Sequence, residues 1–165
     1  MRLIQIAAFG LVGAAYTTMV LGAYVKAIYA GMSCPEWPTC DDGLVLPPLD
    51  NAGVAAEMFH RIAATTVIIM GILLLALEWL QYRSEKRLIL LTLATGGLLG
   101  LQVALGAITI SSNLHAVVVT SHLAVATLFF ACTILLAQRV WKLPPPKANA
   151  DAPVNAAESE SAETT

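Results

Sequence analysis

Residues 57–61 read EMFHR, and residues 62–77, IAATTVIIMGILLLAL, follow them as an apolar run without charge. Ionisable side chains at the head of a membrane-length helix are costly to place, so they form a candidate functional site by default. Glu57 precedes His60 by three residues and Arg61 by four, which brings all three near one face of a helix. We expect the rest of the chain to hold this helix face against another functional residue of the chain, and the best candidate for that residue is His122.

Composition and segment length predict an integral membrane protein. Of the 165 residues, 58% are hydrophobic and 12% are charged, whereas a soluble domain carries about 25% charged residues. Four apolar segments reach the roughly 20 residues that a spanning helix needs, and we place them at residues 3–28, 53–81, 87–110 and 115–141. They lack the alternation of barrel strands. The predicted fold is an all-α integral membrane four-helix bundle, whose first helix is retained rather than cleaved.

The Lys and Arg residues predict the orientation of this bundle. They flank the second loop and the C-terminal end of the last helix, whereas the long loop between the first two helices is acidic, with Lys26 at its edge. The positive-inside rule then places both termini in the cytoplasm and the long loop outside. Residues 1–142 form the bundle domain, and residues 143–165 form a disordered acidic tail because their composition cannot bury a core. No nucleic-acid partner is expected.

A weak internal repeat relates the two halves of the bundle. The sequence GAYV at residues 22–25 has an echo in GAIT at residues 106–109, and a histidine follows near the start of the next helix each time. Small residues also recur along the first and third helices, where they allow close helix packing or self-association. The pattern indicates a degenerate two-helix repeat related by an axis along the membrane normal.

The two histidines of this repeat suggest a heme site. If the second and fourth helices start near Asn51 and Asn113, His60 and His122 each lie about nine residues, roughly 13 Å, below the helix starts. Two imidazoles at matched depth on parallel helices can sandwich a heme. A zinc or copper ion would need further ligands that the surrounding sequence does not offer. The alternative is that each histidine only forms a hydrogen bond between helices.

Other polar residues near the outer surface have two interpretations each. His115 either faces water, which we favour, or bonds a heme propionate. Arg61 and Lys26 either neutralise the propionates or, for Lys26, extend to the lipid headgroups. Cys34 and Cys40 lie on the oxidising side, where a structural disulfide is favoured over a redox-active pair.

Several stretches taken together resemble the heme A synthase family. They are GAYVK at residues 22–26, GMSCPEWPTC at 31–40, EMFHR at 57–61 and LQVALGA at 101–107, followed by the helix of His122. They cover about residues 10–140, in the order of the family's N-terminal four-helix half. The resemblance implies a prokaryotic plasma-membrane oxidoreductase that oxidises the C8 methyl of heme O to a formyl group, giving heme A.

The resemblance also implies roles for single residues. His60 and His122 would be the axial ligands of the heme iron, with Glu57 as the catalytic carboxylate and Cys34 and Cys40 as the outer-loop disulfide. The bound heme would be heme O or heme A, as substrate or product, with heme b as the other possibility. A plain salt bridge to Arg61 is the alternative role for Glu57.

One departure from the family pattern bears on partners. Familiar members have two four-helix halves, each with a histidine pair, whereas this sequence has one half and one pair. The resemblance therefore implies a homo-oligomer or a separate redox partner, and heme O synthase and an electron acceptor are further candidate partners.

Two other classes of protein share part of the pattern. A bis-histidine heme b electron-transfer protein, or a heme carrier, would use the histidines without Glu57. A membrane thiol oxidoreductase would use Cys34 and Cys40, although such enzymes often have a Cys-x-x-Cys pair and the spacing here is Cys-x₅-Cys.

Overall fold

The computed structural model describes residues 1–40 and 50–146, and all regular structure in these residues is helical. The four helices are α1 (Leu3–Ala27), α2 (Ala52–Tyr82), α3 (Lys86–Ser111) and α4 (Ala116–Trp141). Each end lies within one residue of the predicted end. All four helices are long and apolar enough to cross a membrane, so the prediction of an all-α membrane bundle is confirmed.

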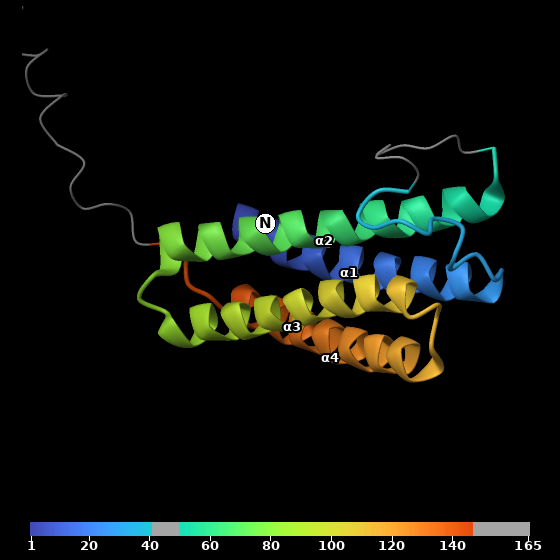
Figure 1. Cartoon of the computed structure of the whole chain (residues 1–165). Helices are drawn as coiled ribbons and strands as arrows, with labels where there is room; N and C mark the ends of the chain where they lie inside the picture. Colours follow the sequence, from blue (N-terminus) through green and yellow to red (C-terminus); the bar gives the residue numbers. More distant parts are fainter. Residues whose placement is uncertain (41–49, 147–165) are drawn as a thin grey trace, which may run out of the picture.

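The helices run antiparallel to their chain neighbours and form a four-membered bundle (Figure 1). α1 packs against α2 and α4, and α3 packs against the same two helices, so α1 and α3, like α2 and α4, are diagonal to each other. Figure 1 also shows that the α1–α2 and α3–α4 connections lie at one end of the bundle and the α2–α3 turn at the other. α2 and α4, which carry His60 and His122, therefore run in the same direction across the bundle.

The main apolar core fills the end of the bundle that lies away from the α1–α2 and α3–α4 connections. Its buried members come from the first half of α1, the second halves of α2 and α4, and the start of α3, and they include Ile4, Leu74, Leu136 and Val140. Alanines at positions 7, 8 and 15 let α1 approach its neighbours closely. The outward-facing side chains are also apolar, as lipid requires: Ile72 and Leu90 are 65% and 68% exposed.

Arg2 ties three segments together at this packed end. Its guanidinium donates to the Tyr82 hydroxyl at 2.7 Å, to the Leu143 carbonyl at 2.6 Å and to the Pro144 carbonyl. These bonds hold the N-terminus, the end of α2 and the segment after α4 at one end of the bundle. The cytoplasmic orientation of that end stays a prediction, and the predicted acidic tail lies mostly in residues 147–165, outside the described residues.

Candidate functional site

His60 is fixed in place by α1. Asn51 caps α2 by accepting hydrogen bonds from the Gly53 and Val54 amides, which sets the start of the helix and places His60 two turns in. The Nδ1 atom of His60 lies 3.0 Å from the Thr18 carbonyl oxygen. Since a carbonyl only accepts, Nδ1 carries the proton and the lone pair is on Nε2.

The imidazole of His60 also rests directly on Gly22. A Cβ atom at position 22 would lie 2.9 Å from Cε1 and 3.3 Å from Nδ1 of His60. That approach is too close for two carbon atoms, whose favourable separation begins at about 3.5 Å. Glycine at this position is therefore what allows the ring to lie against α1.

His122 has a similar but looser setting on α3. Its Nε2 atom lies 3.2 Å from Nε2 of Gln102, and a Cβ atom at Gly106 would be 3.5 Å from its Cε1, an ordinary contact. Because an amide nitrogen only donates, Nε2 of His122 must accept, and the ring proton is on Nδ1. That Nδ1 and the Oε1 of Gln102 are both buried without a hydrogen-bond partner in the described part of the chain.

The two histidines therefore occupy related positions in the predicted repeat. Each ring lies over the first glycine of the GAYV or GAIT stretch and contacts the residue four positions earlier, which is Thr18 or Gln102. The helix start near Asn113 that was assumed for the depth of His122 lies three residues too early, because Asn113 and Leu114 adopt left-handed φ angles of 51° and 60° and His115 is the N-cap. The predicted span 115–141 is itself within one residue of α4.

Buried Glu57 and half-buried Arg61 form an ion pair under the outer loop. Arg61 donates from Nη2 to Oε1 of Glu57 at 2.7 Å, and the Cys34 amide donates to Oε2 of Glu57 at 2.9 Å. Glu57 is 4% exposed, so both carboxylate oxygens are bonded and shielded. The salt bridge that sequence reasoning gave as the alternative role of Glu57 is thus present.

Arg61 holds the outer loop as well as Glu57. Its guanidinium donates to four carbonyl groups of the loop, at Cys34 (2.8 Å), Glu36 (2.8 Å), Pro38 (3.3 Å) and Thr39. We call this set of bonds from Arg61 to Glu57 and the four loop carbonyls the Arg61 clamp. Its only signal in the sequence was the Glu-x-x-x-Arg spacing. Because these contacts use the donor groups on both terminal nitrogens, the predicted role of Arg61 at a heme propionate stays a prediction.

The remaining predicted residues lie around this clamp. The structure pairs Cys34 and Cys40 as a disulfide, with their Cα atoms 4.5 Å apart, and both residues are buried. Lys26 is exposed in the last turn of α1, and His115 is exposed at the start of α4. Within the described residues neither side chain is assigned a hydrogen bond, and the choice between water and a heme propionate for His115 stays a prediction.

Sequence reasoning missed one buried acid, Glu78. It is fully buried on α2, accepts a 2.9 Å hydrogen bond from the Thr92 hydroxyl, and leaves Oε2 without a partner among the described residues. It lies just past the uncharged run 62–77 and inside the helix predicted over residues 53–81. α2 ends at Tyr82, and the hydrogen bond from Thr92 makes Glu78 an interior residue that joins α2 to α3.

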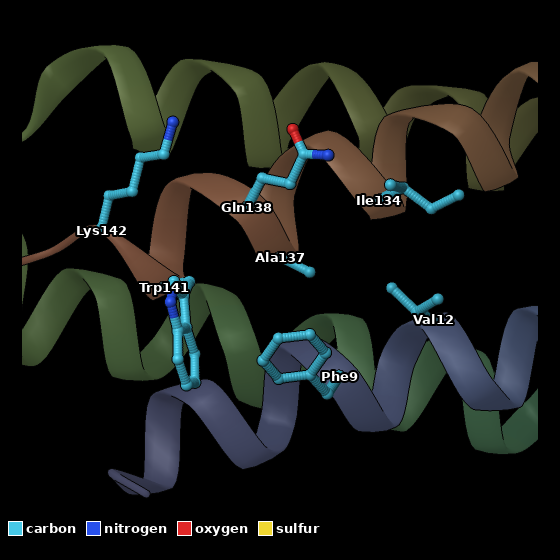
Figure 2. Close-up of a pocket in the computed structure, with 7 residues that line it drawn as sticks. All are labelled: Phe9, Val12, Ile134, Ala137, Gln138, Trp141 and Lys142. Carbon is cyan, nitrogen blue, oxygen red and sulfur yellow. The ribbon is translucent and has the colours of Figure 1, made fainter.

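Two hollows open on the sides of the bundle. One, of about 410 Å³, lies between α1 and α4, and Figure 2 shows Phe9 and Trp141 beside each other at its rim. The other, of about 460 Å³, lies mainly between α2 and α3 and is lined almost entirely by apolar side chains and glycines. Neither of these two hollows includes His60 or His122 in its lining.

The donor set at the histidines suits a heme better than a bare metal ion. Within residues 1–40 and 50–146, no three His, Cys, Asp or Glu side chains gather closely enough to hold a metal by themselves. Heme iron needs only axial ligands from the protein because the porphyrin supplies the other four. The Nε2 lone pair of His60 and the glycine beneath its ring fit such a ligand.

Fold and site together define a membrane four-helix bundle with a histidine on each of two diagonal helices. Residues 51–160, about two thirds of the chain, match the COX15-CtaA family of cytochrome oxidase assembly proteins. The chain therefore belongs to this family. Its four candidate spans and this membership make it a multi-pass protein of the plasma membrane.

Curated relatives agree with the family assignment. The chain is 37% identical over 79 residues to heme A synthase of Symbiobacterium thermophilum, and the aligned residues make up 48% of this chain and 24% of the relative. It is 28% identical over 119 residues to heme A synthase of Listeria welshimeri, and the aligned residues make up 70% of this chain and 37% of the relative. The chain thus spans well under half the length of these relatives.

Proposed function

We propose that this chain acts in heme A biosynthesis as a heme A synthase-like oxidoreductase. In this proposal it binds heme O between His60 and His122 and oxidises the C8 methyl group to a formyl group, giving heme A. Family membership and the curated relatives support the broad role. The observation that carries the site is the placement of His60 and His122 on diagonal helices, each against a glycine of the preceding helix.

The histidines would hold the iron, and the neighbouring residues would orient them. The proton on Nδ1 of His60 is held by the Thr18 carbonyl, which is the usual second contact of a metal-binding histidine. Nε2 of His60 is then the atom that would face the iron. The heme, when bound, supplies the redox chemistry, while the chain sets its axial ligands and excludes water.

Glu57 is proposed to act in the reaction through the outer loop. Its carboxylate is desolvated and bonded to both Arg61 and the Cys34 amide, so a change in the loop would change the bonding of the carboxylate. A carboxylate in such a setting can accept or release a proton as the methyl group is oxidised. The alternative is that the pair only fastens the loop.

A structural disulfide between Cys34 and Cys40 is part of the same proposal. The two cysteines are 0% and 3% exposed, which leaves little access for a second thiol to attack the bond. The burial therefore favours a staple that keeps the loop carbonyls facing Arg61 over a membrane thiol oxidoreductase. Self-association, heme O synthase and an electron acceptor remain proposals for partners.

Pigment analysis tests the proposed reaction. The full chain is produced in cells that also make heme O, as wild type, as Glu57→Gln and as Glu36→Gln, and the extracted hemes are separated and identified by mass. Glu36 is a suitable control because it is an exposed carboxylate of the same loop. We expect heme A or a hydroxylated heme O in wild type and in Glu36→Gln, and unmodified heme O in Glu57→Gln.

The other outcomes separate the alternatives. Heme b alone in all three proteins would contradict the synthase proposal and support an electron-transfer cytochrome. Heme A in Glu57→Gln at the wild-type level would leave Glu57 with the loop-fastening role only. Wild-type protein that purifies without any heme, or full retention of heme in both His60→Ala and His122→Ala, would contradict the histidine site.

A further inference from the structure

The two histidines differ in how firmly each is held, although the repeat relates them. The ring of His60 rests on Gly22 with no room for a methyl group, whereas the ring of His122 is in ordinary contact with Gly106. Nδ1 of His60 donates to the Thr18 carbonyl, whereas Nδ1 of His122 is buried without a partner in the described chain. One ring is therefore fixed by two contacts that the other lacks.

The difference extends to the nitrogen that a metal would use. No described residue is assigned a hydrogen bond to Nε2 of His60, but Nε2 of His122 accepts from the Gln102 amide at 3.2 Å. That amide competes with any metal for the same lone pair. Gln102 has no compensating bond at Oε1, which is also buried and unpartnered.

We propose that Gln102 is a gating residue that covers the metal-binding nitrogen of His122 and makes this axial position the exchangeable one. The inference rests on the proposed heme site. His60 would then be the permanent ligand of the heme iron, and His122 the ligand whose nitrogen the Gln102 amide can also occupy. A redox enzyme whose substrate and product are both hemes must bind and release them, and one exchangeable ligand allows release without disturbing the firmly held His60.

A positional argument supports Gln102 as the gate. Gln102 occupies in α3 the place that Thr18 occupies in α1, four residues before the glycine under the histidine. Thr18 contributes a backbone carbonyl that acts on Nδ1, a contact that assists metal binding. Gln102 contributes a side-chain amide that acts on Nε2, a contact that opposes it. The same position in the repeat thus has opposite effects on the two rings.

Heme titration of the ligand-free full chain tests the gate without any catalytic readout. The purified protein in detergent is titrated with ferric protoporphyrin IX, and its absorption spectrum reports whether the iron has two histidine ligands. The reduced complex is then mixed with carbon monoxide, which binds only when one axial ligand leaves. The variants are Gln102→Met, which keeps the length of the side chain without a donor, and Gln102→Leu as a second replacement.

Removal of the competing amide has a defined expected effect. Both Gln102 variants should bind heme about three- to tenfold more tightly, the net strength of one hydrogen bond, and carbon monoxide should bind more slowly by a similar factor. Thr109→Val is the matched control, since the hydroxyl of Thr109 bonds only the Leu105 carbonyl of its own helix. His60→Ala should weaken heme binding more than His122→Ala.

Two results would overturn the inference while leaving the heme site intact. In one, the absorption spectrum shows two histidine ligands, but the Gln102 variants bind heme and carbon monoxide as wild type does. The other is weaker heme binding in both variants, which would make Gln102 a supporting residue. If heme binding depended on neither histidine, the proposed function itself would fail instead.

Discussion

Gly22→Ala is the sharpest test of how α1 positions His60. The added Cβ atom would lie 2.9 Å from Cε1 and 3.3 Å from Nδ1 of His60, so the ring must move by about 0.6 Å or more to reach van der Waals distance. That movement pulls Nδ1 away from the Thr18 carbonyl, which it now contacts at 3.0 Å. Gly106→Ala is the matched control because its Cβ atom would meet His122 at an ordinary 3.5 Å.

The expected loss follows from these two contacts. One hydrogen bond contributes about 1 kcal/mol, and overpacking of a close contact costs about 1–3 kcal/mol. We expect Gly22→Ala to lower the free energy of unfolding of the ligand-free protein in detergent by about 1–3 kcal/mol. Heme binding should weaken by about tenfold or more, since 1.4 kcal/mol corresponds to a factor of ten. Gly106→Ala should change either quantity by less than about 0.5 kcal/mol.

Unfolding in a denaturing detergent, followed by far-ultraviolet circular dichroism, gives the free energy of unfolding. Titration with ferric protoporphyrin IX gives the heme affinity. Equal effects of Gly22→Ala and Gly106→Ala on both would refute the argument, because the two histidines would then be held equally. A loss of stability without a loss of heme affinity would separate the packing of α1 and α2 from the heme site.

Two further substitutions test the buried polar contacts. Arg61→Lys replaces a planar group that bonds several carbonyls with a point charge, so amide hydrogen exchange in the outer loop should accelerate by about ten- to a hundredfold. Arg83 is an exposed arginine at the other end of α2, and Arg83→Lys should leave that exchange rate unchanged. An unchanged exchange rate in Arg61→Lys would exclude the view that Arg61 holds the outer loop. Thr92→Val removes the only hydrogen-bond donor assigned to Glu78 in the described chain and should lower the free energy of unfolding by about 1–3 kcal/mol. Thr95→Val is its control, since the Thr95 hydroxyl bonds its own helix, and equal losses in the two would contradict a special role for the Thr92 bond.

Local features made the helices predictable from the sequence. Each of the four apolar runs is long enough to cross the membrane and ends at charged or polar residues, and each observed helix end lies within one residue of the expected one. The cap of α2 at Asn51 is equally local, since the Asn51 side chain bonds amides two and three residues later. The turn before α4 was not predicted in detail: Asn113 and Leu114 both adopt left-handed φ angles before the helix begins at Ala116.

The related placement of His60 and His122, each against the glycine of its repeat, was also predictable, because both follow the same small-residue stretch. Their unequal surroundings were not. Thr18 acts on His60 through its backbone carbonyl and Gln102 acts on His122 through its side chain, and sequence spacing does not distinguish a backbone contact from a side-chain contact between helices.

The sequence by itself determined the class of protein, the helices and the residues that carry charge into the membrane, because hydrophobic length and helix spacing are properties of contiguous residues. Only the tertiary structure decided which partners these charges meet. The sequence could not show that the outer loop returns over α2 and brings the carbonyls of residues 34–39 to Arg61. Helix spacing also did not indicate a partner for Glu78, and the packing of α3 against α2 made it a buried acid bonded to Thr92.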